Sequence, residues 1–135
     1  MIIGIGTDMT KVERIAEILG DHGERFAHRC FSEEERTHVE KRAKGDAAAR
    51  AAGYAKRWAA KEACAKALGS GIRDDVFLKD IVVINDSGGA PALILRGGAK
   101  DRLTALTPRG MTPHVHVSLS DEAGMALAFV VISAD

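Results

Sequence analysis

The sequence has few aromatic residues and few cysteines, and both scarcities exclude classes of protein. Aromatics make up 4% of its 135 residues, so the core should be aliphatic, and the frequent alanines favour closely packed helices. Two cysteines, Cys30 and Cys64, are too few for a disulfide scaffold. No apolar run is long enough to span a bilayer, and residues 1–6 look like a strand and not like a charged leader. We therefore expect a cytoplasmic protein with reduced thiols and no membrane partner.

An excess of either charge is also missing. The 19 basic and 19 acidic residues cancel, which argues against a general nucleic-acid binder, because such a protein needs a net basic field. A hydrophobic content of 46% with 28% charged residues predicts a folded chain with a real core. Residues 1–135 match the size of one ordinary domain, and no linker or repeat divides them.

The hydrophobic periodicity predicts a fold of the α+β class, with an antiparallel sheet packed on a long helix. Two capping boxes mark helix starts, Thr10 with Glu13 and Ser32 with Glu35. The first half of the chain is expected to form a buried strand over 1–7 that Asp8 ends, a helix ending near Gly20, a helical turn over 24–29, a helix from the Ser32 cap to about Arg42, and a long helix over 47–68. The second half is expected to form strands over 79–85 and 92–95, a helix over 99–106, and a hairpin of strands over 114–120 and 125–133.

The long helix carries the most suggestive chemistry. At about 100° per residue, Trp58, Glu62 and Lys66 share one stripe, and Arg57 and Lys61 share another. A carboxylate beside cations suits a phosphate site in which a metal bridges the oxyanions. A Glu–Lys pair one turn apart is also common on exposed helices, where it contributes about 0.2–0.5 kcal/mol. The helix alone favours this second interpretation, although the alanines around the charges indicate close packing.

Asp8 and the Gly69-Ser70-Gly71 turn each allow two interpretations. Asp8 could cap the following helix, or it could share Mg²⁺ with Glu62, since Mg²⁺ takes one or two protein carboxylates and fills its sphere with phosphate oxygens and water. The glycine turn could bring backbone amides to a phosphate, or it could simply end the long helix. It is not a P-loop, because the Gly-Lys-Ser/Thr run is absent.

The first helix has a basic face with an apolar centre. Lys11, Arg14 and Ile18 fall in a narrow arc, and Arg25 and Arg29 follow. Such a patch suits an acidic partner helix. A solvated face is an equal alternative, because four acids are interleaved in the sequence: Glu13, Glu17, Asp21 and Glu24.

Three further residues invite chemical readings that we disfavour. His114 and His116 point to one face of a strand and could bind Zn²⁺, but no third ligand is apparent, so a half-buried polar strand face is preferred. Cys64 is expected to be a small core residue.

Five motifs in order resemble the holo-acyl-carrier-protein synthase family, the small trimeric bacterial type within the phosphopantetheinyl transferase superfamily. The most specific is Arg57-Trp58-Ala59-Ala60-Lys61-Glu62-Ala63 followed by Lys66-Ala67-Leu68-Gly69-Ser70-Gly71. The others are Gly4-Ile5-Gly6-Thr7-Asp8 with Arg14-Ile15, Phe31-Ser32-Glu33-Glu34-Glu35, Asp80-Ile81 with Asn85-Asp86, Gly89 and Pro91, and His116-Val117-Ser118-Leu119-Ser120. The resemblance covers nearly the whole chain without a large insertion, and it implies the phosphopantetheinyl transferase fold.

The resemblance also implies an activity. Members transfer 4′-phosphopantetheine from coenzyme A to a serine of apo-acyl carrier protein, release adenosine 3′,5′-bisphosphate and support fatty acid biosynthesis. It implies Asp8 and Glu62 as Mg²⁺ ligands, Lys66 as the catalytic cation on the reacting phosphate, and a homotrimer with sites at subunit interfaces. The implied coenzyme A site has Arg57, Ser70, Gly71, Pro91 and Asp121, and the implied carrier-protein site has Arg14, Ile18 and Arg25.

One departure keeps other functions open. Many family members have histidine where this chain has Asp121, and an aspartate supplies no cation beside the coenzyme A phosphates. A non-catalytic binder of coenzyme A or of a carrier protein is therefore one alternative. Another is a different Mg²⁺-dependent enzyme that acts on a nucleotide diphosphate. The general base is also open, between Asp8 and a metal-activated water.

Overall fold

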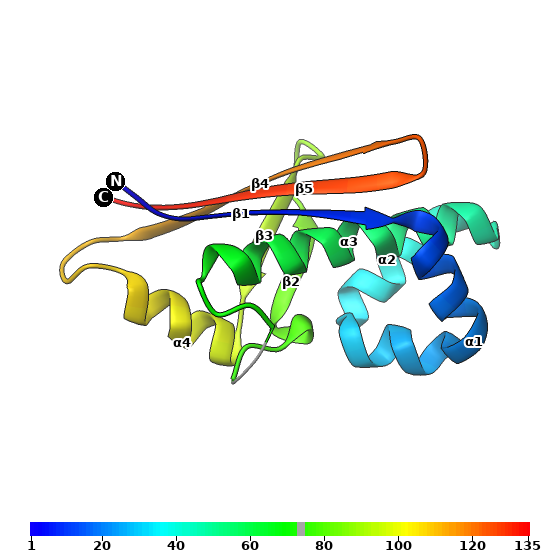
Figure 1. The fold of residues 1–135 in the computed structure, drawn as a ribbon, viewed down its shortest axis with the longest axis horizontal. Helices are drawn as coiled ribbons and strands as arrows, with labels where there is room; N and C mark the ends of the chain where they lie inside the picture. The colour runs from blue at the N-terminus through cyan, green and yellow to red at the C-terminus, as the bar shows by residue number, and fades with distance from the viewer. Residues whose placement is uncertain (73–74) are drawn as a thin grey trace.

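The long helix α3 (Ala47–Ala67) lies at the centre of the computed structural model, which describes residues 1–72 and 75–135 (Figure 1). A sheet lies along one flank of α3, α1 and α2 cover one of its ends, and the two chain termini lie together beyond the other (Figure 1). The remaining elements in the described part are β1 (Ile2–Lys11), α1 (Val12–Cys30), α2 (Glu33–Ala43), a 3₁₀ turn (Leu78–Asp80), β2 (Ile81–Asn85), β3 (Pro91–Leu95), α4 (Gly97–Leu106), β4 (Pro113–Glu122) and β5 (Met125–Ala134). The expected α+β class is confirmed.

Helix α3 has the local signals of a stable helix at both ends. The Asp46 side chain accepts a hydrogen bond from the Ala49 amide at 3.0 Å, and the chain turns away at Gly69, whose φ of 76° is the left-handed conformation that favours glycine. Its alanines from Ala55 onward are buried, so neighbouring backbones approach this part of the helix closely. The predicted helix over 47–68 is confirmed to within one residue.

Strand β1 is longer than predicted. It belongs to an antiparallel sheet of order β1-β5-β4, and it continues past Asp8, which pairs with Ala128, as far as Lys11. The predicted Thr10 cap is therefore wrong, because Thr10 is still in the strand and its hydroxyl donates to Asp8 Oδ2 at 2.8 Å. Lys11 precedes α1 without a side-chain cap, so Asp8 is not a helix cap either.

The two faces of β1 are the reverse of the usual pattern. Its small residues Gly4 and Gly6 lie against the backbone of α3, while Ile5 and Met9 are 61% and 65% exposed. Phe129 of β5, the cross-strand partner of Thr7, is 43% exposed on the same outer face. The prediction of a buried strand is wrong for this face, which presents an apolar surface to solvent.

The first helix is broken instead of ending at Gly20. Helix α1 runs to Cys30 with a kink at Gly23, where φ is 44° and ψ is −120°, so the predicted helical turn over 24–29 is its second half. The Ser32–Glu35 capping box of α2 is confirmed, with hydrogen bonds of 2.9 and 3.2 Å. A cluster of Phe26, Phe31, Tyr54 and Trp58 lies between these helices, so the core is less purely aliphatic than composition suggested.

The two predicted hairpins are confirmed, with small differences in where the strands begin and end. Strands β2 and β3 pair from Ile81 opposite Leu95 to Asn85 opposite Pro91. Strand β4 extends through Asp121 and Glu122, so the β4–β5 turn is shorter than predicted. In the part of the chain that is described, no helix combines the length and the apolar character needed to cross a bilayer.

Candidate active site

Three predicted site residues meet where β1 crosses α3. Lys66 Nζ donates to the Thr7 carbonyl at 2.9 Å and lies 3.4 Å from Asp8 Oδ1. The other carboxylate oxygen of Asp8 accepts the Thr10 hydroxyl, which fixes its orientation. Glu62 lies one turn before Lys66 on α3 and is close enough to Asp8 for the two charges to interact. We call Asp8, Glu62 and Lys66 the carboxylate cluster.

The electrostatics of the carboxylate cluster suit a divalent cation. Burial raises the pKa of Glu62, and the neighbouring Asp8 carboxylate raises it further, while Lys66 and Arg14 oppose the shift. Two like charges held together from separate elements gain from a bound cation. Among residues 1–72 and 75–135 no three acidic, histidine or cysteine side chains form a metal cluster. Mg²⁺ needs only one or two protein carboxylates, so the donor set fits it and not Zn²⁺.

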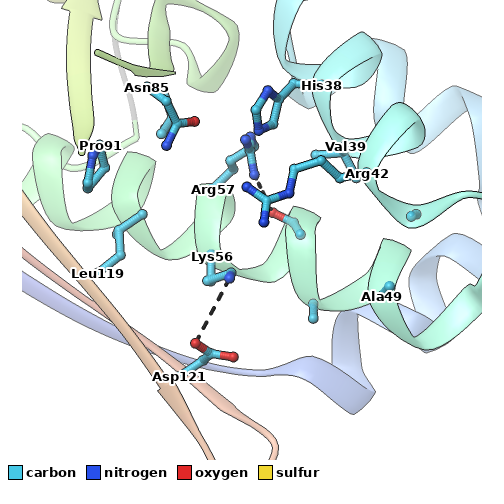
Figure 2. Close-up of a pocket in the computed structure, with 14 residues that line it drawn as sticks. His38, Val39, Arg42, Ala49, Lys56, Arg57, Asn85, Pro91, Leu119 and Asp121 are labelled. Carbon is cyan, nitrogen blue, oxygen red and sulfur yellow. Dashed lines mark hydrogen bonds and ion pairs between the residues drawn. The ribbon is translucent and has the colours of Figure 1, made fainter. Parts of the chain in front are cut away.

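A second feature is a cavity of about 420 Å³ between α2, α3 and the two hairpins (Figure 2). It brings together three of the five residues predicted for coenzyme A, namely Arg57, Pro91 and Asp121. The other side chains or backbone that line it are His38, Val39, Arg42, Ala43, Ala49, Ala52, Gly53, Lys56, Val83, Asn85 and Leu119. We call it the cationic cavity, because Arg42, Lys56 and Arg57 all contribute to it.

Arg57 is the most buried of these cations. Its Nη1 donates to the Gly53 carbonyl at 3.1 Å, but its buried Nε has no partner among the described residues. Burial lowers the pKa of Arg57. Burial also lowers the pKa of His38, and the charges of Arg57 and Arg42 lower it further. A buried donor without an acceptor, in a field that disfavours added positive charge, is the setting for an anionic ligand.

Asp121 is the one carboxylate among the residues described as lining the cationic cavity. One of its oxygens lies 3.9 Å from Lys56 Nζ, as the dashed line in Figure 2 shows. Both side chains are partly exposed, so this ion pair is weak. Asp121 therefore has a cationic neighbour in Lys56, and its carboxylate lowers the net positive charge that the cavity offers to an anion.

Ser70 and Gly71 lie apart from the cationic cavity. The Gly69 and Gly71 amides donate to the Lys66 and Ala65 carbonyls at 2.9 and 3.0 Å, so the turn ends α3 as a cap and these two N–H groups are already used. Ser70 lines a separate hollow of about 390 Å³ with Asp75, Val76, Gly98, Asp101 and Arg102. Within one chain, these two predicted coenzyme A residues do not join Arg57.

The predicted carrier-protein residues lie on α1. Arg14 and Arg25 are exposed and Ile18 is half-buried. Arg14 is near enough to Glu62 to influence it, so this face begins beside the carboxylate cluster. The kink at Gly23 separates Arg25 from the other two residues.

The other residues considered in the sequence analysis have structural roles. Lys61, grouped above with the cations of the long helix, is fully buried against Glu35 and faces neither feature. Cys64 is a core residue as expected, and burial raises the pKa of its thiol to about 12. His114 and His116 are exposed on β4, and His114 pairs with Asp135, which agrees with a polar strand face.

Sequence reasoning missed His38, Arg42, Lys56 and Asn85, which line the cationic cavity. They come from α2, α3 and β2, and no spacing in the sequence connects them. Two signals were available, Asn85 in the fourth family motif and Lys56 next to Arg57, but neither indicates a ligand-binding side chain without the fold.

Comparisons with known proteins define first the class of this fold. The structure resembles the crystal structure of holo-[acyl-carrier-protein] synthase from Neisseria meningitidis at 38% identity and a TM-score of 0.77, over 98% of this chain and 99% of that one. It also resembles the Bacillus anthracis holo-(acyl-carrier-protein) synthase in complex with CoA (3′,5′-ADP), at 36% identity and a TM-score of 0.76, over 98% and 96% of the two chains. The fold is thus that of a phosphopantetheinyl transferase.

The sequence comparisons give the family. A model of the 4′-phosphopantetheinyl transferase superfamily matches residues 4–120. The holo-[acyl-carrier-protein] synthase of Rhodopseudomonas palustris (strain TIE-1) is 56% identical over 134 residues, which is 99% of this chain and 91% of that protein. The chain belongs to the 4′-phosphopantetheinyl transferase superfamily and, within it, to the holo-[acyl-carrier-protein] synthase family, as the five motifs indicated.

Proposed function

We propose that this chain transfers 4′-phosphopantetheine from coenzyme A to a serine of an apo-acyl carrier protein. The observation that carries the proposal is the carboxylate cluster, in which Asp8 and Glu62 are close enough for their charges to interact and Lys66 Nζ lies 3.4 Å from Asp8. The products are holo-acyl carrier protein and adenosine 3′,5′-bisphosphate. Residues 1–135 act as one domain in this proposal.

The chemistry needs positioning and charge neutralisation more than a reactive side chain. The serine oxygen of the carrier protein attacks the pantetheine-side phosphorus of the pyrophosphate, a new P–O bond forms, and the bond to adenosine 3′,5′-bisphosphate breaks. The serine proton passes to Asp8 or to a water beside it. The nucleophile comes from the carrier protein and not from this chain, and the thiol of Cys64 is buried, which agrees with that assignment.

Asp8 and Glu62 would hold Mg²⁺, which when bound neutralises charge on the pyrophosphate. Lys66 lies within reach of the same place and would contact the phosphate under attack, giving its developing charge a second cationic partner. Lys66 is half exposed, and its contacts with Asp8 and with the Thr7 carbonyl are open to solvent, so it can exchange them for a ligand at little cost.

The cationic cavity would receive the phosphates and nucleotide of coenzyme A. Arg57, Arg42 and Lys56 offer guanidinium and ammonium donors, and Pro91 and Leu119 offer apolar walls. The predicted roles of Ser70 and Gly71 in coenzyme A binding require a different arrangement, since both lie outside this cavity.

That separation supports a homotrimer with active sites shared between subunits. Asp8, Glu62 and Lys66 do not line the cationic cavity of their own chain, so a neighbouring copy could place its carboxylate cluster at this cavity. The outer sheet face, with Ile5, Met9, Leu127 and Phe129 exposed, is an apolar surface of the kind that subunits cover. A closed ring of three copies would cover it in each.

The basic face of α1 would bind the carrier protein. Arg14 and Arg25 suit an acidic helix, with Ile18 as an apolar contact between them. Because Arg14 is near enough to Glu62 for its charge to act on that carboxylate, a carrier docked here would have its serine near the carboxylate cluster. We place the reaction in the cytoplasm, in support of fatty acid biosynthesis, which agrees with two free buried cysteines.

The test is intact-mass analysis of an apo-acyl carrier protein incubated with this chain, coenzyme A and Mg²⁺. We expect the pantetheinyl mass increment, and its loss when Mg²⁺ is chelated. Tight coenzyme A binding without the increment, while another transferase modifies the same carrier, would instead support a non-catalytic binder. Unchanged turnover after Arg14→Glu would support an enzyme that acts on a diphosphate without a carrier.

A further inference from the structure

Glu35 of α2 and Lys61 of α3 form an ion pair at 2.7 Å, and both side chains are 0% exposed. Every proton of the Lys61 ammonium has an acceptor, because Nζ also donates to the Leu78 and Ile81 carbonyls at 2.8 and 2.6 Å. The Glu35 carboxylate accepts hydrogen bonds at both of its oxygens. Its Oε1 also accepts the Ser32 amide at 2.9 Å, and its Oε2 accepts the Val83 amide at 3.1 Å.

This pair joins three of the elements that line the cationic cavity, namely α2, α3 and β2. Glu35 lies one helical turn before His38 and Val39 on α2, and Lys61 lies one turn after Arg57 on α3. Val83 itself lines the cavity from β2, two residues before Asn85. Helices α2 and α3 each carry one member of the pair about one turn from a cavity residue, and β2 is hydrogen-bonded to the pair through Val83.

Stability alone gives a poor reason for such a pair. Removing two charges from water costs as much as their attraction returns, and apolar residues of similar volume often replace buried ion pairs without loss of stability. A set of several hydrogen bonds, by contrast, fixes direction, because each bond loses strength when its geometry shifts. The contacts are spread over α2, α3, the 3₁₀ turn and β2, which is what an orienting device requires.

We propose that Glu35 and Lys61 are positioning residues that hold α2, α3 and β2 at the spacing at which the cationic cavity fits coenzyme A. The inference rests on the proposed function of that cavity. The carboxylate cluster is held separately, by the close packing of β1 on α3. Loss of the pair therefore weakens coenzyme A binding and leaves the chemical step largely intact.

The test compares the full-length wild type with the double variant Glu35→Leu/Lys61→Met, which keeps side-chain volume and removes both charges. Thermal unfolding, coenzyme A binding by calorimetry and steady-state transfer are measured on each. We expect a Tm near that of the wild type, a rise of about tenfold or more in the Kd and KM for coenzyme A, and a kcat within about threefold.

Tyr54→Phe is the matched control, since the Tyr54 hydroxyl also links α3 to α2, through Glu40 at 3.0 Å, but reaches neither β2 nor the cavity. We expect it to leave the coenzyme A KM unchanged. An equal rise in both variants would mean general loosening of the helices and would overturn the positioning role, as would an unchanged KM in the double variant.

Glu35→Gln serves if the double variant does not fold. Its amide can accept at only one of the two positions that Oε1 and Oε2 now occupy, so we expect a smaller KM rise in the same direction. Failure of both variants to fold would show that the pair maintains the fold itself and would overturn the proposal. If the wild type neither binds coenzyme A nor transfers phosphopantetheine, the proposed function is wrong. If the wild type is active and the double variant is unaffected, only the positioning role is wrong.

Discussion

Gly6 of β1 rests against the carbonyl of Ala63 in α3, and no space remains between them for a Cβ atom. Gly4 makes the same approach to Ala67 one turn further along α3. These two contacts bring the strand backbone onto the helix. As a result Asp8, the next residue but one after Gly6, lies beside Glu62 and Lys66.

Gly6→Ala should therefore damage both stability and activity. The new methyl group must push β1 away from α3, at a cost of about 1–3 kcal/mol, and it should move Asp8 away from Glu62. We expect a lower Tm and a weaker apparent Mg²⁺ affinity in the transfer assay. Gly20→Ala is the control, because its Cβ would meet open space in α1 and should stabilise the helix by about 0.5–1 kcal/mol. A Gly6→Ala variant with wild-type Tm would contradict the close packing of β1 on α3.

Glu62→Gln should raise the Tm of the metal-free protein at neutral pH. The folded-state pKa of Glu62 is raised by burial and by Asp8, so above its unfolded pKa the ionised carboxylate destabilises the folded chain. The glutamine removes that penalty. The gain should shrink as the pH falls, because Glu62 is then protonated in both states. Thermal unfolding in the presence of a chelator at pH 7 and pH 4 measures the Tm gain, and the exposed Glu17→Gln is the control. A Tm gain that is larger at pH 4 than at pH 7 would contradict a raised pKa for Glu62.

Asp121→Asn should strengthen coenzyme A binding. The substitution removes the carboxylate described in the cationic cavity and frees Lys56 from its 3.9 Å contact. We expect a Kd about threefold lower at low salt, with the gain fading as added salt screens the charges. Calorimetric titration with coenzyme A gives the value, and Glu122→Asn on the same strand is the control. Weaker binding would mean that Asp121 contacts the ligand as an acceptor.

Mixed trimers should recover activity from two inactive variants. If each site combines the carboxylate cluster of one chain with the cationic cavity of its neighbour, Glu62→Gln and Arg57→Gln chains refolded together at equal amounts should restore roughly one quarter of the sites. Each variant alone should be inactive, and each refolded alone serves as its control. No recovery in mixtures that sedimentation shows to be trimeric would place both groups of one site in a single chain.

What the sequence could predict depended on whether the cause was local. The Ser32–Glu35 box and the ends of α3 involve neighbours within one turn, and both are found as expected. The Thr10–Glu13 box failed because pairing with β5 keeps Thr10 in an extended strand, and a tertiary contact overrides a cap. For the same reason Lys61 looked like a site cation, since its partner Glu35 is 26 residues away.

The site divided in the same way. Helical spacing predicted that Glu62 and Lys66 lie on one face of the long helix. The family resemblance added Asp8, and the fold brings this β1 residue next to Lys66. The cationic cavity needed the fold, because His38, Arg42 and Asn85 reach it from separate elements. The outward apolar face of β1 was also hidden, since glycines on the inner side reverse the usual hydrophobic alternation.

We propose that Asp8 and Glu62 form the catalytic metal site of a phosphopantetheinyl transferase. It is tested most directly by the transfer rate of Glu62→Gln relative to wild type, at saturating coenzyme A, apo-acyl carrier protein and Mg²⁺. We predict a loss of at least tenfold, or about 1.4 kcal/mol of transition-state stabilisation, in a variant that is folded and still binds coenzyme A. Wild-type turnover by that variant would contradict the claim and remove Glu62 from the active site.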